Sequence, residues 1–106
     1  MSKLGSVKFK GKSGAQYAFS VYPLQTRIRS GYSGVYVITE RKHGREGGFV
    51  HKRMYTGQGE NLSESVVRDD ASTSTRGANC ICVYAEKDAG QRHKIEQDLA
   101  ARAASV

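Results

Sequence analysis

The sequence of 106 residues has no tryptophan, one proline and two cysteines. It also has no apolar run long enough to cross a bilayer, since a transmembrane helix needs about 20 predominantly apolar residues. The first residues, Met1 to Gly5, lack the apolar region of a secretory signal. We therefore expect no membrane partner and a cytoplasmic location. The length predicts a single domain over residues 1–106, with a modest core that needs no metal or disulfide.

The two cysteines, Cys80 and Cys82, are too few for a zinc site, because structural zinc usually takes four ligands. They lie two apart in an apolar segment typical of a strand, so their side chains are expected on one face. In a reducing compartment the simplest interpretation is two buried thiols that behave as small apolar residues.

Acidic residues are scarce in the first part of the chain. Residues 1–59 contain eleven Lys and Arg against Glu40 and Glu46, which gives +9. Residues 60–106 contain six against eight acids, which gives −2, and the two parts sum to the total of +7. A one-sided basic field suits a phosphate backbone, since each neutralised phosphate releases counterions. A surface that only keeps the protein soluble would look the same, so charge alone leaves both interpretations open.

Alternating polar and apolar residues predict an N-terminal β-hairpin over residues 6–23. The turn falls at Gly11 to Gly14, and Pro23 ends the second strand because proline has no N–H to donate. Residues 24–33 then form a connection or a short edge strand. We expect its arginines to point the same way, either toward solvent or toward a nucleic-acid backbone.

A second predicted hairpin joins residues 34–40 to residues 51–57 through a glycine-rich loop. Side chains alternate along strands, so Tyr36 lies on one face of the first strand, and Arg53 and Tyr55 share one face of the second. A register that brings these faces together predicts a polar patch of two phenols and one guanidinium.

The loop of this second hairpin is mostly cationic. It is either a flexible arm that follows a phosphate backbone or contacts a protein, or only a long hairpin tip. The candidate nucleic-acid-binding residues are cations of the strands and loops: Arg27, Arg29, Arg41, Lys42, Arg45, Lys52 and Arg53.

Two helices and one buried strand are expected in the rest of the chain. Asn61 is a suitable N-cap for a helix over residues 61–70, and residues 80–85 are apolar on both faces, as in a central strand. Asp88 is expected to cap a second helix that runs to about Ala104.

The second helix has an apolar stripe of Ile95 and Leu99, with Arg92 outside it. Glu96 lies at the edge of the stripe. A carboxylate there could hold a magnesium ion, which prefers oxygen ligands and retains waters. The alternative is an ion pair with Arg92 one turn earlier.

Two tripeptides in the second hairpin resemble those of a known family. Gly34-Val35-Tyr36 and Tyr55-Thr56-Gly57 are similar to the signature tripeptides of the GIY-YIG nuclease domain, with Val and Thr in place of Ile. A turn and helix, a buried strand and a helix with Arg92-x-x-x-Glu96 follow in the expected order, so the resemblance covers about residues 30–100.

The resemblance implies a small α/β (α+β) GIY-YIG-like domain. Its central mixed or antiparallel sheet would contain the Tyr36, Tyr55 and Cys80 strands, with flanking helices, a core over residues 30–104 and the N-terminal hairpin added. It also implies that Tyr36 or Tyr55 deprotonates the nucleophile with a metal-bound water. Glu96 would be the single protein ligand of Mg²⁺.

The chain departs from the family at one catalytic position. Family members have an arginine in the first helix after the second tripeptide, and that position falls at or beside Ser65 here. Arg68 lies three residues further, about 4.5 Å along a helix axis, and is the candidate replacement. Asp69 and Asp70 would repel a phosphate. Losing one donor to the transition state costs about 100- to 1,000-fold in rate.

The favoured interpretation is therefore a nuclease-like protein that binds nucleic acid, with DNA as the expected partner, and cleaves it weakly or not at all. One alternative is an active magnesium-dependent endonuclease in which Arg68 or Arg53 supplies the missing cation. The other is a protein-binding inhibitor or adaptor, of the kind mobile elements encode, built on a lapsed nuclease fold.

Overall fold

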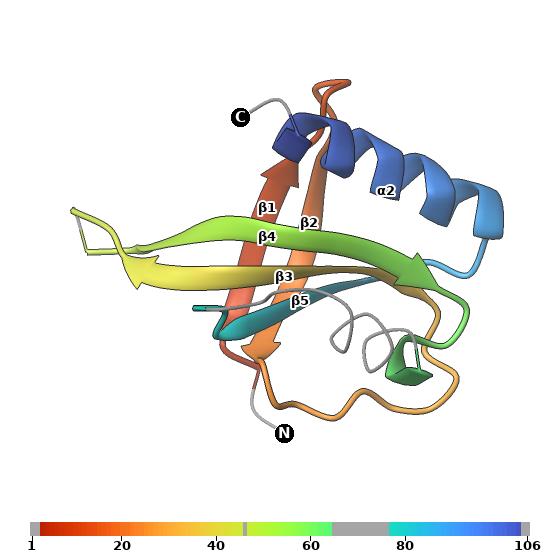
Figure 1. Cartoon of the computed structure of the whole chain (residues 1–106), viewed down its shortest axis with the longest axis horizontal. Coiled ribbons are helices and arrows are strands. Elements are labelled where there is room, and N and C mark those ends of the chain that lie inside the picture. The colour runs from red at the N-terminus through yellow and green to blue at the C-terminus, as the bar shows by residue number, and fades with distance from the viewer. Residues whose placement is uncertain (1–2, 46, 65–76, 105–106) are drawn as a thin grey trace.

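The computed structural model describes residues 3–45, 47–64 and 77–104, with side chains as far as residue 100. Its fold is α+β: a curled five-stranded sheet, or half-barrel, with an N-terminal hairpin and a C-terminal helix (Figure 1). The strand order is β1-β2-β5-β3-β4, and every one of these neighbouring pairs is antiparallel. The sequence left open a mixed or an antiparallel central sheet, and the structure shows the antiparallel one.

The elements agree with the predicted order along the chain. Their bounds are β1 Gly5–Lys10, β2 Gln16–Pro23, β3 Gly34–His43, β4 Phe49–Gly59, β5 Cys80–Ala85 and α2 Ala89–Ala104. The N-terminal hairpin is confirmed, with Gly14 at φ 92° in its turn. Of the helix predicted over residues 61–70, residues 62–64 are helical, and residues 65–70 lie outside the described part of the chain.

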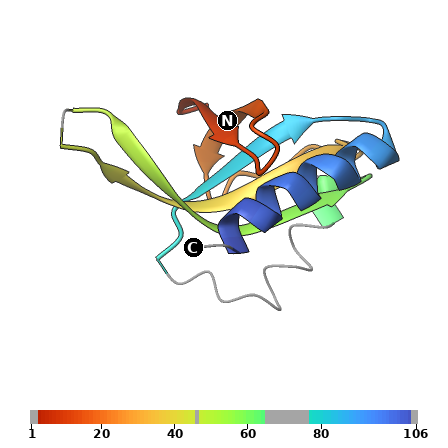
Figure 2. The same cartoon turned by 90° about the horizontal axis from the view of Figure 1, so that it is seen from above.

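The second hairpin is longer than predicted. Pairing continues to His43 and Phe49, three residues past Glu40, so the ends of β3 and β4 project beyond the other strands (Figures 1 and 2). We call residues 40–53 the arm. Pairing persists there because alternate side chains from the two strands stack on each other, as described below.

The sheet has a core on each face. One face, here called the helix face, packs α2 through Ile95 and Leu99 onto a cluster that also contains Phe9, Phe19, Val21, Val35, Val37, Cys80 and Cys82. The opposite face, here called the tyrosine face, buries Tyr36, Ile38, Leu62, Ile81 and Val83. Successive residues of β3 and β5 alternate between the two clusters, as strand geometry requires. The central position predicted for residues 80–85 is confirmed.

Both cysteines are free and buried, as predicted. Burial raises the pKa of the Cys82 thiol to about 12. A thiol with this pKa is protonated near neutral pH, and a thiolate is the nucleophilic form. Cys82 is therefore a core residue of β5 and has no role as a nucleophile.

Asp88 begins α2 as predicted, since its Oδ2 accepts a hydrogen bond from the Gln91 N–H at 2.8 Å. The prediction that Arg92 lies outside the buried stripe is wrong: Arg92 is only 6% exposed. Its Nε donates to Gln58 Oε1 at 3.0 Å, and its Nη1 donates to the Lys87 carbonyl at 2.7 Å. These acceptors offset the cost of burying a guanidinium and fasten the start of α2 to the end of β4.

Asp98 fastens the second half of α2 to the turn between β1 and β2. Its Oδ1 accepts the Ser13 N–H at 2.7 Å, and its Oδ2 accepts the hydroxyls of Ser13 at 2.7 Å and Tyr17 at 2.9 Å. Gly11 lies directly beneath this carboxylate, where a Cβ atom would collide with Oδ2. The contact between the turn and the helix therefore requires the glycine at position 11 and the ionised carboxylate of Asp98.

We expect Asp98→Asn to destabilise the protein at pH 7 but not in acid. Hydrogen bonds from the Ser13 side chain and backbone hold the pKa of Asp98 below its ordinary value of 3.8. The stabilisation is present above that value and is lost as the pH falls through the lowered folded-state pKa. Urea unfolding at several pH values should show the gap between wild type and Asp98→Asn closing in acid. The exposed neighbour Gln97→Ala is the control, and a gap that persists at low pH would contradict the ionic role.

Candidate functional site

The structure brings the two predicted tyrosines together. Tyr36 on β3 and Tyr55 on β4 lie on the tyrosine face with ring centroids 6.0 Å apart and planes tilted by 38°. Tyr36 is 1% exposed, and its ring covers Gly57, where a Cβ would approach ring atoms to 2.7 Å. Gly57 is therefore required because a larger residue would displace the Tyr36 ring.

Gly34, the first residue of the other tripeptide, also has a packing role. A Cβ at this position would collide with the carbonyl oxygen of Tyr84 on β5. Gly34 pairs with Ala85 in the register of β3 and β5, so the glycine allows two central strands to approach. Packing thus explains both glycines of the two tripeptides, without reference to catalysis.

Arg53 and Tyr55 were predicted to share a face, and this prediction is wrong. Tyr55 pairs with Ile38, but the next residue of β3, Thr39, pairs with Arg53, so Met54 is an extra residue in a β-bulge. A bulge reverses the alternation on its strand. Tyr55 therefore packs on the tyrosine face, whereas the Arg53 guanidinium lies 5.6 Å from the Phe9 ring centroid on the helix face.

Glu96 lies on α2, which packs on the helix face, whereas Tyr36 and Tyr55 lie on the tyrosine face. The Oε1 atom of the Glu96 carboxylate lies 4.0 Å from the Nδ1 atom of His93 on the same helix. Within residues 3–45, 47–64 and 77–100, no group of three His, Cys, Asp or Glu side chains could hold a metal ion. The described residues therefore do not place Glu96 beside the two tyrosines, as the magnesium site implied by the resemblance would require. The role of Glu96 as a metal ligand stays a prediction.

The remaining catalytic candidate, Arg68, lies outside the described residues, as do Ser65, Asp69 and Asp70. Of the predicted catalytic set, the structure thus brings together only the two phenols. Arg53 is on the opposite side of the sheet from them, which removes the geometric basis for using it as their catalytic partner.

The arm presents cations and aromatic rings on one side. Every second cross-strand pair of the arm puts its side chains on the helix-face side, counting from Arg53. These side chains are Arg53, Arg41 with its partner His51, and His43 with its partner Phe49. The Arg41 guanidinium lies 4.0 Å from the Phe49 ring centroid, and the His43 ring centroid lies 4.8 Å from it. Among the described arm residues, the only acid is Glu40, which is on the other side. We call this set the basic aromatic strip.

The other side of the arm and its tip contain the remaining predicted cations. Lys42 and Lys52 are exposed on the side that also contains Glu40, whose Oε1 lies 3.7 Å from the Lys42 Nζ. Arg45 is exposed at the tip. Cations therefore surround the projecting part of the hairpin, and the structure places five of the seven candidate nucleic-acid-binding residues on this one element.

His51 is half-buried where the arm joins the rest of the sheet. Burial, with a smaller effect from Arg41, lowers the pKa of His51 below 6.5, so the ring is neutral at pH 7. Its Nδ1 lies 2.9 Å from the Thr39 hydroxyl, and its ring meets the Phe9 ring edge-on at 6.3 Å. His51 therefore supports the base of the basic aromatic strip and adds no charge to it.

Phe49 is the residue of the strip that sequence reasoning missed. It is 52% exposed, and the adjacent Val50 is 60% exposed. The available signal was the pair Phe49 and Val50, two apolar residues directly after a run of glycines and charged residues. The apolar segment was too short to be assigned to the second strand from its pattern alone. Large apolar residues at an exposed hairpin end favour contact with another molecule.

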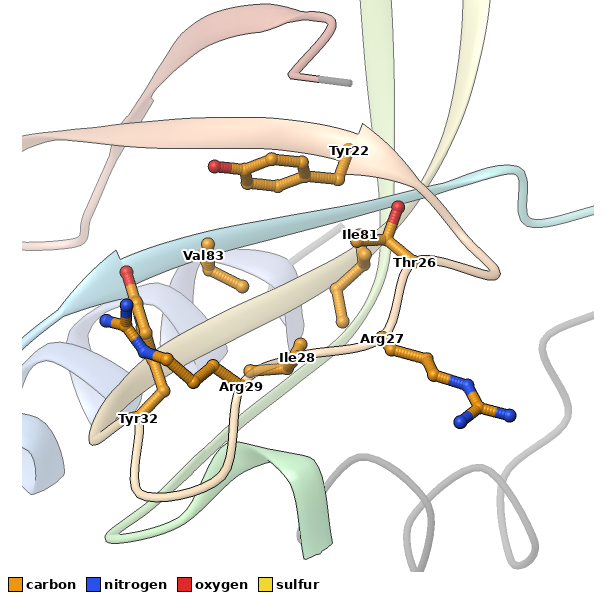
Figure 3. Close-up of a pocket in the computed structure, with 8 residues that line it drawn as sticks. All are labelled: Tyr22, Thr26, Arg27, Ile28, Arg29, Tyr32, Ile81 and Val83. Carbon is orange, nitrogen blue, oxygen red and sulfur yellow. The ribbon is translucent and has the colours of Figure 1, made fainter. Parts of the chain in front are cut away.

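The last two candidate nucleic-acid-binding residues, Arg27 and Arg29, lie beside a separate cavity on the tyrosine face, on the other side of the sheet from the basic aromatic strip. This cavity has a volume of about 230 Å³ and is lined by side chains of β2, β5 and the 24–33 connection (Figure 3). Its two tyrosines, Tyr22 and Tyr32, were also missed, because they are ten residues apart and become neighbours only when the connection folds over the sheet.

No helix within the described ranges is long and apolar enough to span a membrane. Comparisons with protein-family models, with curated proteins and with solved structures found no match to this chain. Its relation to the GIY-YIG nucleases is therefore a proposal that rests on the residues of the chain itself.

Proposed function

We propose that this protein binds nucleic acid, with duplex DNA as the expected partner, through the arm, and that it cleaves the bound strand weakly or not at all. The observation that supports this most directly is the basic aromatic strip. Arg41 lies over the ring of an exposed Phe49 on one side of a projecting two-stranded ribbon, and Arg53 lies on the same side nearer the sheet. Lys42, Arg45 and Lys52 add exposed cations on the other side and at the tip.

The shape and chemistry of the arm suit this partner. A two-stranded β-ribbon fits the major groove of B-form DNA, and lysine and arginine side chains along it would contact the phosphates on either side. An exposed aromatic ring near the end of the ribbon could contact the methyl groups of thymines in that groove. These contacts position the protein without reading much sequence, so we expect strong salt dependence and weak sequence preference.

We further propose that the domain is a degenerate GIY-YIG-like nuclease fold. Supporting observations are the order β5-β3-β4 and the contact between the Tyr36 and Tyr55 rings. The opposite placement of α2 and the tyrosines favours lapsed chemistry over an active endonuclease. A nuclease in which Arg53 replaces the missing arginine is disfavoured by the bulge at Met54.

A protein-binding inhibitor or adaptor is the second candidate. The exposed Phe49 and Val50 at the arm favour it, because large apolar side chains are common at the centres of protein interfaces. Co-purification with a protein, together with no DNA affinity at moderate salt, would support it against the nucleic-acid proposal.

A magnesium-dependent cleavage assay tests the lapsed chemistry. We expect wild type to shift plasmid DNA in a gel without nicking it. Ser65→Arg restores one transition-state donor, which is worth about 100- to 1,000-fold in rate in an otherwise complete site. We expect no nicking from it here, because Glu96 and the two tyrosines lie on opposite faces of the sheet. Nicking by wild type that Glu96→Ala abolishes would contradict the loss of activity and establish an active endonuclease. Nicking that Ser65→Arg gains and that Glu96→Ala removes would show that the arginine was the one missing part of the site.

A further inference from the structure

The cavity bounded by Arg27 and Arg29 has the construction of a binding site. Its floor is apolar, formed by Ile81 and Val83 of β5 and by Ile28, and its walls include the rings of Tyr22 and Tyr32. In Figure 3 the Tyr22 ring lies along one side of the cavity, and the Tyr32 ring and the Arg29 guanidinium lie next to each other at one end. Among the residues that the structure describes, no acidic side chain lines it.

The connection that closes the cavity is held in place at both ends. Leu24 donates its N–H to the Asn79 carbonyl at 3.1 Å, and the Tyr32 carbonyl accepts the N–H of Leu62 at 2.8 Å. Gly31, at φ 84°, allows a turn in which the Tyr32 N–H donates to the Arg29 carbonyl at 3.2 Å. The cavity is therefore formed before a ligand arrives, so binding would not have to order this segment.

The lining indicates the chemistry of the occupant. A volume of about 230 Å³ is below the roughly 300–1,000 Å³ of sites for drug-sized ligands, so it suits one small flat group. Burial, with a smaller effect from Tyr22, raises the pKa of Tyr32, so its phenol keeps the proton and can donate to a polar ring edge. Arg27 and Arg29 are exposed, and Figure 3 shows the Arg27 guanidinium directed away from the cavity, at the opposite end from Arg29.

We propose that this cavity receives one unpaired base of a single-stranded nucleic acid, with the phosphates on either side of that base against Arg27 and Arg29. The inference rests on the proposed nucleic-acid-binding function. An aromatic wall accepts the face of any base, and two cations at opposite ends match a backbone that passes across the opening. The cavity lies on the tyrosine face, whereas the basic aromatic strip lies on the helix-face side of the arm. One protein could therefore hold duplex at the arm and an unpaired nucleotide at the cavity.

The test compares two single strands of equal length and charge, oligo-dT and the same oligomer with abasic residues at its centre. We expect wild type to bind oligo-dT about 5- to 150-fold more tightly, the range that one stacked base supplies. Tyr22→Leu with Tyr32→Leu should remove this preference and leave affinity for the abasic strand and for duplex DNA unchanged. Tyr22→Phe with Tyr32→Phe keeps both rings and should retain most of the preference. Fluorescence anisotropy measures each affinity, and thermal unfolding checks that each variant is folded.

Arg27→Gln with Arg29→Gln gives an independent test, because both side chains are exposed and outside the core. For oligo-dT the slope of log K against log salt should become shallower by about 1.4, since each phosphate contact to a single strand contributes about 0.7. An unchanged slope would overturn the cavity proposal, as would a base preference that follows Phe49→Leu instead of the two tyrosines. Duplex binding without any preference for oligo-dT would overturn it while the arm's function stands. Absence of all nucleic-acid binding would overturn both.

Discussion

Lys42→Gln, Arg45→Gln and Lys52→Gln combined are expected to weaken duplex DNA binding on the order of 100-fold at about 0.1 M salt. The three side chains are exposed on the arm, so their loss removes phosphate contacts and leaves the core intact. Each lost contact to B-form DNA makes the slope of log K against log salt shallower by about 0.9, so the triple variant should lose about 2 to 3 from the slope. Anisotropy titrations over a series of salt concentrations measure both quantities.

The matched control changes the same number of charges away from the arm. Lys8, Lys87 and Lys94 are exposed on β1, before α2 and on α2. Their replacement with glutamine should change the affinity by only a few-fold, through the lower net charge of the protein. Equal losses in the two triple variants would show that binding follows total charge and would contradict a specific role for the arm.

Gly34→Ala is expected to lower the free energy of unfolding by about 3 kcal/mol or more, at the upper end of overpacking effects. The added methyl group would collide with the Tyr84 carbonyl, a backbone atom of a central strand that cannot rotate away. Gly57→Ala meets the ring of Tyr36, which can shift at some cost, so we expect a smaller loss of about 1–3 kcal/mol. Urea unfolding measures both.

Gly48→Ala is the control for these glycine substitutions, because nothing lies within 4 Å of a Cβ at that exposed position. We expect its effect to stay within about 0.5 kcal/mol, as for other surface substitutions. Wild-type stability in Gly34→Ala would mean that β3 and β5 do not pair in the register described, and the two-faced arrangement derived from that register would fail with it.

The strands were predictable because their sequence signals are local. Residues 35–38 are a continuous run of β-branched and aromatic residues, which is typical of a strand buried on both faces, and the N-terminal hairpin shows a polar and apolar period of two. The cap at Asp88 was predictable for a similar reason, since a carboxylate and the N–H three residues later form it alone.

The bulge at Met54 was not predictable, and it changed the site. One extra residue in β4 leaves the sequence pattern of Arg53 and Tyr55 intact but sends their side chains to opposite faces. The burial of Arg92 was hidden in the same way, because the carbonyls of Glu86 and Lys87 and the Gln58 amide meet it only in the folded chain. Sequence periodicity gives the faces of regular elements, whereas these two features depend on tertiary contacts.

Salt titration of duplex DNA binding by the wild-type protein, with and without a magnesium chelator, tests the proposed function most directly. We expect affinity to fall steeply between about 50 mM and 200 mM salt, with a slope of about −3 or steeper, and to be unchanged by the chelator. Affinity that is absent at low salt, or that does not depend on salt, would contradict binding of the phosphate backbone by the arm.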